Sequence, residues 1–172
     1  MFRKAVQADL DAIVSIYSAI HDREESGLST TGWVRSIYPT RTTAQQSIIA
    51  NDMFVLEEDD QILAAAKINQ IQGEEYRFAP WTLDAPEHEV MVLHTLVVSP
   101  NRAGQGIGTR FVAFYEELAA QSGCTCLRMD TNERNSAARS LYKKLAYTEV
   151  GIVPCVFNGI EGVRLVCLEK RL

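Results

Sequence analysis

Apolar residues recur along the chain in two spacings, which separate predicted helices from predicted strands. After Asp9, which is suited to cap a helix, they repeat every three or four residues through Ile20, as in an amphipathic helix. Short continuous runs such as Leu96–Val98 are typical of strands covered on both faces. The predicted elements, in chain order, are a strand over Phe2–Val6, a helix from Asp9, a helix from Thr42 or Thr43 to Asn51–Asp52, strands over Met53–Leu56, Ile62–Ile68 and Glu89–Val98, a helix ending near Ser122–Gly123, a strand over Cys124–Met129, a helix capped by Asn135 or Ser136, and strands over Glu149–Phe157 and Val163–Leu168.

This order of elements predicts an α/β (α+β) domain, with one mixed sheet and helices on both faces. Asn158–Gly159 lies between the last two strands and is a hairpin signal. The segment Asn69–His88 is the least regular part of the chain and is rich in aromatic residues. Such a segment is either a binding loop or a loop that lays its aromatic side chains on the core, and both interpretations stay open.

Three alternating glycines stand where the strand ending at Val98 gives way to a helix. Pro100 stops the strand, and Gly104, Gly106 and Gly108 then leave the backbone bare at the helix start. Unpaired N–H groups and the helix dipole at such a position favour an anion, with phosphate the expected occupant. The alternative is a glycine-rich connection that only packs a helix close to a sheet. Neither a dinucleotide fingerprint nor a Walker A loop fits, because the third glycine is one position early and no lysine follows.

Composition narrows the class of protein. The 172 residues are 47% hydrophobic and 23% charged, which is typical of one globular domain spanning residues 1–172. A net charge of −5 disfavours nucleic-acid binding, and no apolar run reaches the length of a membrane helix. We expect a cytoplasmic protein, because the first residues lack the apolar core of a signal peptide. The four cysteines lie in apolar segments without metal-site spacing, so we expect buried thiols and no metal; they are Cys124, Cys126, Cys155 and Cys167.

Two motifs resemble those of the GCN5-related N-acetyltransferases. Val97-Val98-Ser99-Pro100 followed by Ala103-Gly104-Gln105-Gly106-Ile107-Gly108 is similar to the main motif of that family, and Asn135 to Tyr142 is similar to a second. The resemblance covers essentially the whole chain. It implies a mostly antiparallel sheet of six to seven strands with a splayed central pair. It also implies transfer of an acetyl group from acetyl-CoA to a primary amine of a small molecule or peptide, by direct attack. Many members are homodimers, and a homodimer of this chain could form by pairing of the apolar C-terminal strands of two chains.

The resemblance places the pyrophosphate of coenzyme A on the glycine turn and the pantetheine arm along the edge of the preceding strand. The family usually has Arg or Gln where this chain has Ala103, so Arg102 either compensates or is a solvated surface arginine. Ala146 stands where the family usually has glycine. The cofactor-binding residues implied are Leu96, Val97, Val98, Arg102, Gly104, Gln105, Gly106, Ile107, Gly108, Thr109, Asn135 and Tyr142.

The same resemblance makes Tyr142 the candidate general acid and the backbone N–H of Val98 the candidate oxyanion donor. A phenol with a pKa of about 10 stays protonated at neutral pH and can give its proton to a thiolate. The alternative for Tyr142 is simple packing, because it shares an apolar stripe with Leu141 and Leu145. Asn135 is expected to reach the pantetheine or an ordered water, and capping the helix is an adequate alternative.

The candidate general base is His94, whose ordinary pKa of about 6.5 suits the task. Its parity in the strand predicts that it faces the same side as Leu96 and Val98. A hydrogen-bonded core histidine is the alternative role, and the alternative bases are Glu87, His88 and Glu89.

The acceptor site is predicted between the segments Ser26–Arg41 and Asn69–His88. Asp130 either orients the acceptor amine or caps a turn. The predicted aromatic lining consists of Trp33, Tyr38, Tyr76 and Trp81. A non-catalytic acyl-CoA-binding or regulatory module on the same fold is the competing function, favoured by Ala103 and disfavoured by Tyr142 and His94.

Overall fold

A single seven-stranded sheet organises the computed structural model, which describes residues 1–172. The strand order is β1-β2-β3-β4-β5-β7-β6, and only β4 and β5 run parallel. This confirms the predicted fold class and order of elements. The strands are β1 (Phe2–Lys4), β2 (Met53–Glu58), β3 (Gln61–Asn69), β4 (Val90–Val98), β5 (Cys126–Asn132), β6 (Thr148–Phe157) and β7 (Ile160–Arg171). The helices are α1 (Leu10–Glu25), α2 (Arg41–Ile49), α3 (Ile107–Gln121) and α4 (Ser136–Lys144), with short 3-10 turns at Gln7–Asp9, Glu74–Phe78, Glu87–Glu89 and Pro100–Arg102.

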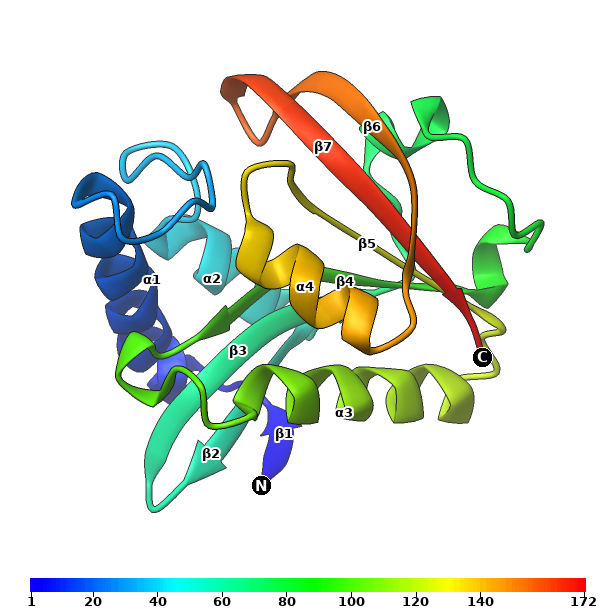
Figure 1. The fold of residues 1–172 in the computed structure, drawn as a ribbon. Coiled ribbons are helices and arrows are strands. Elements are labelled where there is room, and N and C mark those ends of the chain that lie inside the picture. Colours follow the sequence, from blue (N-terminus) through cyan, green and yellow to red (C-terminus); the bar gives the residue numbers. More distant parts are fainter.

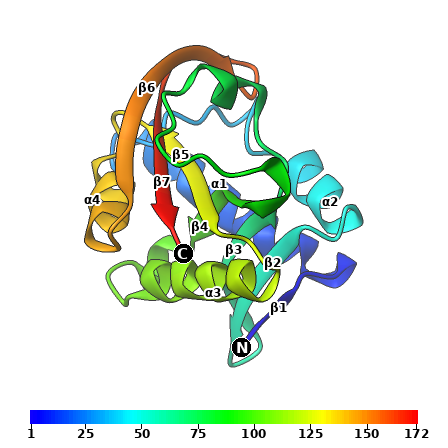
Figure 2. The same cartoon turned by 90° about the vertical axis from the view of Figure 1, so that its right-hand side faces the viewer.

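Helices cover both faces of the sheet, α1 and α2 on one and α3 and α4 on the other (Figure 1). The core beneath α3 and α4 contains Phe111 and Tyr115, both fully buried, and the core beneath α1 and α2 contains Ile13 and Tyr17. The irregular segment 70–89 covers the β5–β7 half of the face that α1 and α2 share (Figure 2). The sheet therefore packs against three separate apolar clusters, one on the face of α3 and α4 and two on the opposite face. On that second face, the gap between the helices α1 and α2 and the irregular segment is available for a functional site.

Local signals at the ends of elements were partly right. Asn158 and Gly159 form the predicted two-residue hairpin turn, with φ angles of 50° and 80°. The predicted cap of α2 at Thr42 or Thr43 is wrong, because Thr40 is the N-cap and accepts a hydrogen bond from the Thr43 backbone N–H. Asp9 precedes α1 but does not cap it with its side chain, because its carboxylate binds the Arg3 guanidinium at 2.7 Å.

Three other expectations concern the thiols, the membrane and the sheet edge. All four cysteines are free thiols; Cys124, Cys126 and Cys167 are buried, as predicted, and Cys155 is half-buried. None of the helices combines the length and the apolar character needed to cross a bilayer. β6 is an edge strand of the sheet. Pairing of the C-terminal strands between two chains stays a prediction.

Ala146 shows how the chain leaves α4 without the glycine that is usual there. Its φ of 65° is left-handed, and the N–H groups of Ala146 and Tyr147 donate to the carbonyls of Lys143 and Tyr142 at 3.1 and 3.0 Å. A side chain at such a position costs about 1 kcal/mol. We therefore expect Ala146→Gly to raise the free energy of unfolding by about 1 kcal/mol, measured by urea denaturation.

The matched control for this prediction is Ala137→Gly, an exposed position inside α4. There the same substitution should lower stability by about 0.5–1 kcal/mol, because glycine loses more backbone freedom in a helix. Destabilisation of similar size by both variants would contradict the assigned role of the left-handed conformation.

Candidate active site

A cleft opens where β4 and β5 separate. The two strands pair from Val90 to Leu93 of β4, which lies beside Met129, and no pair follows beyond that point. The rest of β4 therefore has one edge that no strand covers. Ser99 N–H donates to the Leu63 carbonyl of β3 at 2.8 Å. Because amides alternate along a strand, the Val98 N–H points away from β3 and into the cleft.

A β-bulge at Thr95 sits at the point of separation. Lys67 of β3 pairs with His94 and Ala65 pairs with Val97, so two residues of β4 oppose one of β3. Thr95 has a φ of 53°, which is rare for a β-branched residue, and its hydroxyl is hydrogen-bonded to the Tyr38 hydroxyl. The bulge places the irregularity of the backbone inside the candidate site.

The bulge also overturns the parity prediction for His94. Leu93 and Val98 both pack against the α3–α4 core, although they are five positions apart, because the extra residue shifts the alternation. His94 therefore lies on the opposite face from Leu96 and Val98, on the side of α1 and the irregular segment. The expectation that His94 shares their face was wrong.

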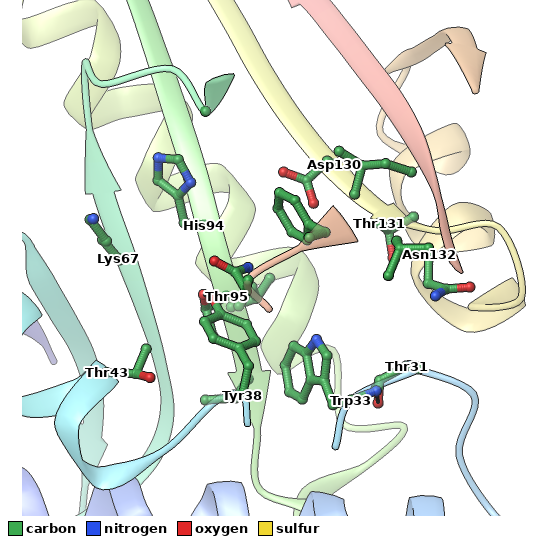
Figure 3. A pocket seen from close by; sticks show the side chains of 18 of the residues that line it. Thr31, Trp33, Tyr38, Thr43, Lys67, His94, Thr95, Asp130, Thr131 and Asn132 are labelled. Carbon is green, nitrogen blue, oxygen red and sulfur yellow. Dashed lines mark hydrogen bonds between the residues drawn. The ribbon is translucent and has the colours of Figure 1, made fainter. Parts of the chain in front are cut away.

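The cleft leads into a cavity of about 650 Å³. Residues of α1, α2, β3, β4, β5 and α4 meet there with the irregular segment and the β6–β7 hairpin, so segments that are far apart in the sequence form its wall (Figure 3). Most of the predicted acceptor and pantetheine residues are brought together. Those that line the cavity are Trp33, Tyr38, Tyr76, His94, Leu96, Val97, Val98, Asp130, Asn135 and Tyr142.

The glycine turn lies outside the cavity, beyond the end of β4. Gly104 and Gly106 have φ angles of 78° and 73°, and a Cβ at either would meet no atom within 4 Å. Bare backbone therefore faces open space at the N-terminus of α3, which fits a polyphosphate group. Gly108 has a different role, since a Cβ there would lie 3.0 Å from Leu141 of α4. Arg102 is half-buried on the same turn, and Gln105 and Thr109 are exposed.

Tyr142 lies where α4 crosses the cleft. Its ring is buried in the α3–α4 core and its side chain also lines the cavity. Burial, and secondarily the nearby Asp130 carboxylate, raises the pKa of Tyr142 well above its ordinary value, so the phenol keeps its proton. Asn135 caps α4 as predicted, with its Oδ1 accepting from the Ala138 N–H at 3.2 Å. Its amide nitrogen makes no hydrogen bond within the chain, so capping and contact with a ligand are compatible.

Asp130 is hydrogen-bonded to Tyr76 in the wall of the cavity. The Tyr76 hydroxyl donates to Asp130 Oδ2 at 2.7 Å. Burial raises the pKa of Asp130, the Tyr76 hydrogen bond partly opposes that rise, and the Glu75 carboxylate adds to it, so that the pKa of Asp130 is about 7. The carboxyl group is therefore poised to exchange a proton near neutral pH.

His94 has a fixed tautomer and a lowered pKa. Its Nε2 lies 3.1 Å from both Asn69 Oδ1 and the Ile71 carbonyl, so Nε2 carries the proton and Nδ1 is an acceptor. Burial and the Lys67 ammonium lower the pKa of His94 to about 4. The imidazole is neutral at pH 7 and takes a proton weakly, contrary to the reasoning from its ordinary pKa. Glu87, His88 and Glu89, the other candidates for the base, lie at the far end of β4 and do not line the cavity.

Trp81 is the one predicted lining residue that the structure places elsewhere. Its Nε1 donates to the Tyr76 carbonyl at 2.7 Å, and the Arg128 guanidinium lies 4.3 Å from its ring centre. Arg128 also donates to the Leu83 carbonyl, and the buried Glu169 carboxylate accepts from the Thr82 N–H. Trp81 therefore anchors the irregular segment on the sheet and does not contact an acceptor. Two interpretations of this segment were left open. Tyr76 fits a binding loop, and Trp81 fits a loop that lays its aromatic side chains on the core.

Two of the cavity residues that sequence reasoning missed bear on its chemistry. Lys67 is the only lysine or arginine that lines it, and Thr95 carries the bulge. The apolar pattern of β3 showed Lys67 only as a polar position near the end of a strand. Neither a bulge nor the level at which two strands pair can be derived from a local pattern.

A parallel strand pair that separates beside a glycine turn, with a helix carrying a tyrosine across the gap, is the arrangement that the motif resemblance implied for an acetyltransferase. Comparison with known proteins identifies the family. The model of the acetyltransferase (GNAT) family matches residues 15–147, so the chain belongs to that family.

Individual relatives agree with this assignment. YhfO, an uncharacterized N-acetyltransferase of Bacillus subtilis, is 35% identical over 60 residues, which are 35% of this chain and 40% of that protein. The chain thus spans less than half of that curated relative. A GNAT-family acetyltransferase from Streptococcus agalactiae superposes with a TM-score of 0.81 at 24% identity, over 100% of this chain and 95% of the other. YncA from Salmonella typhimurium, whose structure contains its cofactor acetyl-CoA, superposes with a TM-score of 0.69 at 18% identity, over 100% and 93% of the two chains.

Proposed function

We propose that this chain transfers an acetyl group from acetyl-CoA to a primary amine of a small molecule or peptide, by direct attack. The observation that carries the proposal is the cleft between β4 and β5. It brings an uncovered strand edge, a protonated phenol and a carboxyl group with a pKa of about 7 to one cavity. Family membership and the acetyl-CoA in the yncA structure support the choice of cofactor.

The residues that would hold acetyl-CoA fall into two groups. The backbone N–H groups from Gly104 to Thr109 suit the pyrophosphate, with Arg102 beside them, because glycine leaves the space open. The uncovered edge of Leu96–Val98 suits the amide groups of the pantetheine, which would add as a short strand. The amide nitrogen of Asn135 is free to donate to it. When bound, acetyl-CoA supplies the activated acyl group.

We assign proton acceptance to Asp130 and proton donation to Tyr142. An alkylamine has a pKa of about 10 and arrives mostly as an ammonium ion. The Asp130 carboxylate accepts one of its protons and so leaves a neutral nucleophile. Tyr142 gives its phenol proton to the departing sulfur and regains one as the amide nitrogen loses its second proton. The Val98 N–H, which points into the cleft, donates to the oxyanion.

His94 takes an orienting role in this scheme. Its Nε2 is fixed by Asn69 and Ile71, and its Nδ1 can accept a hydrogen bond from the acceptor amine. It titrates at a pKa of about 4 and so does not compete with Asp130 for the proton at pH 7.

The test is release of free thiol from acetyl-CoA over a panel of amines, run beside thermal denaturation with and without acetyl-CoA. We expect stabilisation by acetyl-CoA and thiol release with at least one class of amine. Stabilisation without turnover on any amine would instead support a non-catalytic acyl-CoA-binding module. Stabilisation by NAD or ATP but not by acetyl-CoA would overturn the proposal.

A further inference from the structure

Lys67, His94 and Asp130 form a row across three neighbouring strands. Lys67 of β3 pairs directly with His94 of β4. Leu93 lies beside Met129, so the next residue of β5, Asp130, is level with His94. Leu93 and Met129 point into the α3–α4 core, and the row therefore points to the opposite face, into the cavity (Figure 3).

The two ends of this row carry opposite charge. Lys67 makes no hydrogen bond or ion pair within the chain, and it is the only lysine or arginine among the cavity-lining residues. The Asp52 carboxylate accepts from Asn69 Nδ2 at 2.7 Å and forms no ion pair with Lys67. Lys67 is half-buried in the cavity wall and its ammonium group has no partner, so an anionic ligand would form an ion pair there with the protein's own charge unopposed. At the other end, Asp130 stands with Glu75, which also lines the cavity.

Neighbouring strands lie about 4.8 Å apart, so the backbones of Lys67 and Asp130 are separated by about 10 Å. The long lysine side chain shortens the gap between the charged groups. A compact molecule with an amine and a carboxylate therefore fits across the row. A polyamine would instead bring a second cation towards Lys67, which is unfavourable.

We propose that the acetyl acceptor is an amino-acid-type zwitterion, with its carboxylate bound by Lys67 and its amine by Asp130. This inference rests on the proposed acetyl transfer and names the substrate class for it. His94 lies between the two charged ends, where its Nδ1 accepts from the amine. No covalent chemistry is added to the scheme above.

The experiment compares amino acids with their methyl esters, which keep the amine and lose the anion, and with the polyamine spermidine. For the wild-type protein we expect a kcat/KM for the best amino acid at least about tenfold above that for its ester. Lys67→Met should raise the KM for the amino acid by about 10- to 100-fold and leave that for the ester within about twofold. Lys67→Arg should retain most of the discrimination. Comparing the ester with the acid in each variant cancels any effect of Lys67 on His94.

Two outcomes would overturn the inference and leave the proposed function standing. One is equal turnover of acid and ester by the wild type, and the other is an acid-to-ester ratio that Lys67→Met does not change. If no amine is turned over, the proposed function fails, and thermal shift with the same amino acids decides the binding claim. Stabilisation that Lys67→Met abolishes would support the zwitterion site, and its absence would refute it.

Discussion

Replacing Tyr142 with phenylalanine should lower kcat by about 10²- to 10⁴-fold, the range of a lost general acid. The substitution keeps the ring that packs in the α3–α4 core and removes only the hydroxyl, which makes no hydrogen bond within the chain. Folding and the affinity for acetyl-CoA should therefore change little. Steady-state kinetics with saturating acceptor, and the dissociation constant of acetyl-CoA by calorimetry, separate these two quantities.

Tyr147→Phe is the matched control for this prediction. The ring of Tyr147 lies 6.1 Å from that of Tyr142, in the same core, but it does not line the cavity. Its hydroxyl donates to Glu116 at 3.0 Å, so the variant should lose about 1 kcal/mol of stability and keep its kcat. An unchanged kcat in Tyr142→Phe would remove Tyr142 from the mechanism. An equal loss in both variants would point to disturbed packing of α4.

The fold and the position of the glycine turn were largely accessible from the sequence because they depend on local patterns. Alternation of apolar residues, Asn158–Gly159 and the glycine turn each report on a few neighbouring residues. The helix with Asn135 and Tyr142 is similarly local. These signals gave the sheet, the order of its elements and the position of the turn.

The acceptor side could not be derived in the same way, because its properties arise from contacts between distant segments. The bulge at Thr95 places His94 on the opposite face of the sheet from Leu96 and Val98, and a strand pattern does not reveal a bulge. Burial lowers the pKa of His94 and raises that of Asp130, because it disfavours the charged form of each side chain. Lys67 adds to the fall at His94 and Tyr76 limits the rise at Asp130, and both come from other segments. Trp81 and Tyr76 are near neighbours in the sequence, yet only Tyr76 lines the cavity.

The exchange of roles between His94 and Asp130 yields the second large prediction, a change in the pH profile. Asp130 must be ionised to accept a proton, so the wild-type kcat/KM should rise with pH up to a pKa of about 7 and level off above it. If His94 were the base at its pKa of about 4, the profile would already be flat between pH 6 and 8. Asp130→Asn should lower kcat/KM at pH 7.5 by about 10²- to 10⁴-fold. Its residual activity should keep rising towards pH 10, because only the free amine then reacts.

Tyr76→Phe distinguishes loss of the base from a shift of its pKa. The Tyr76 hydroxyl donates to Asp130 and thereby lowers the pKa of that carboxyl group, against the effect of burial. Without this donor the carboxylate is less stable, so the pKa rises and the ascending limb of the profile moves above pH 7, while the plateau at high pH is retained. Loss of the plateau in Asp130→Asn, together with a shift of the ascending limb in Tyr76→Phe, is the pattern expected of a base whose pKa is set partly by one hydrogen bond. A pH profile that neither substitution alters would mean that a group other than Asp130 accepts the proton. A purely structural effect of Tyr76→Phe would lower the plateau and leave the pKa of the ascending limb unchanged.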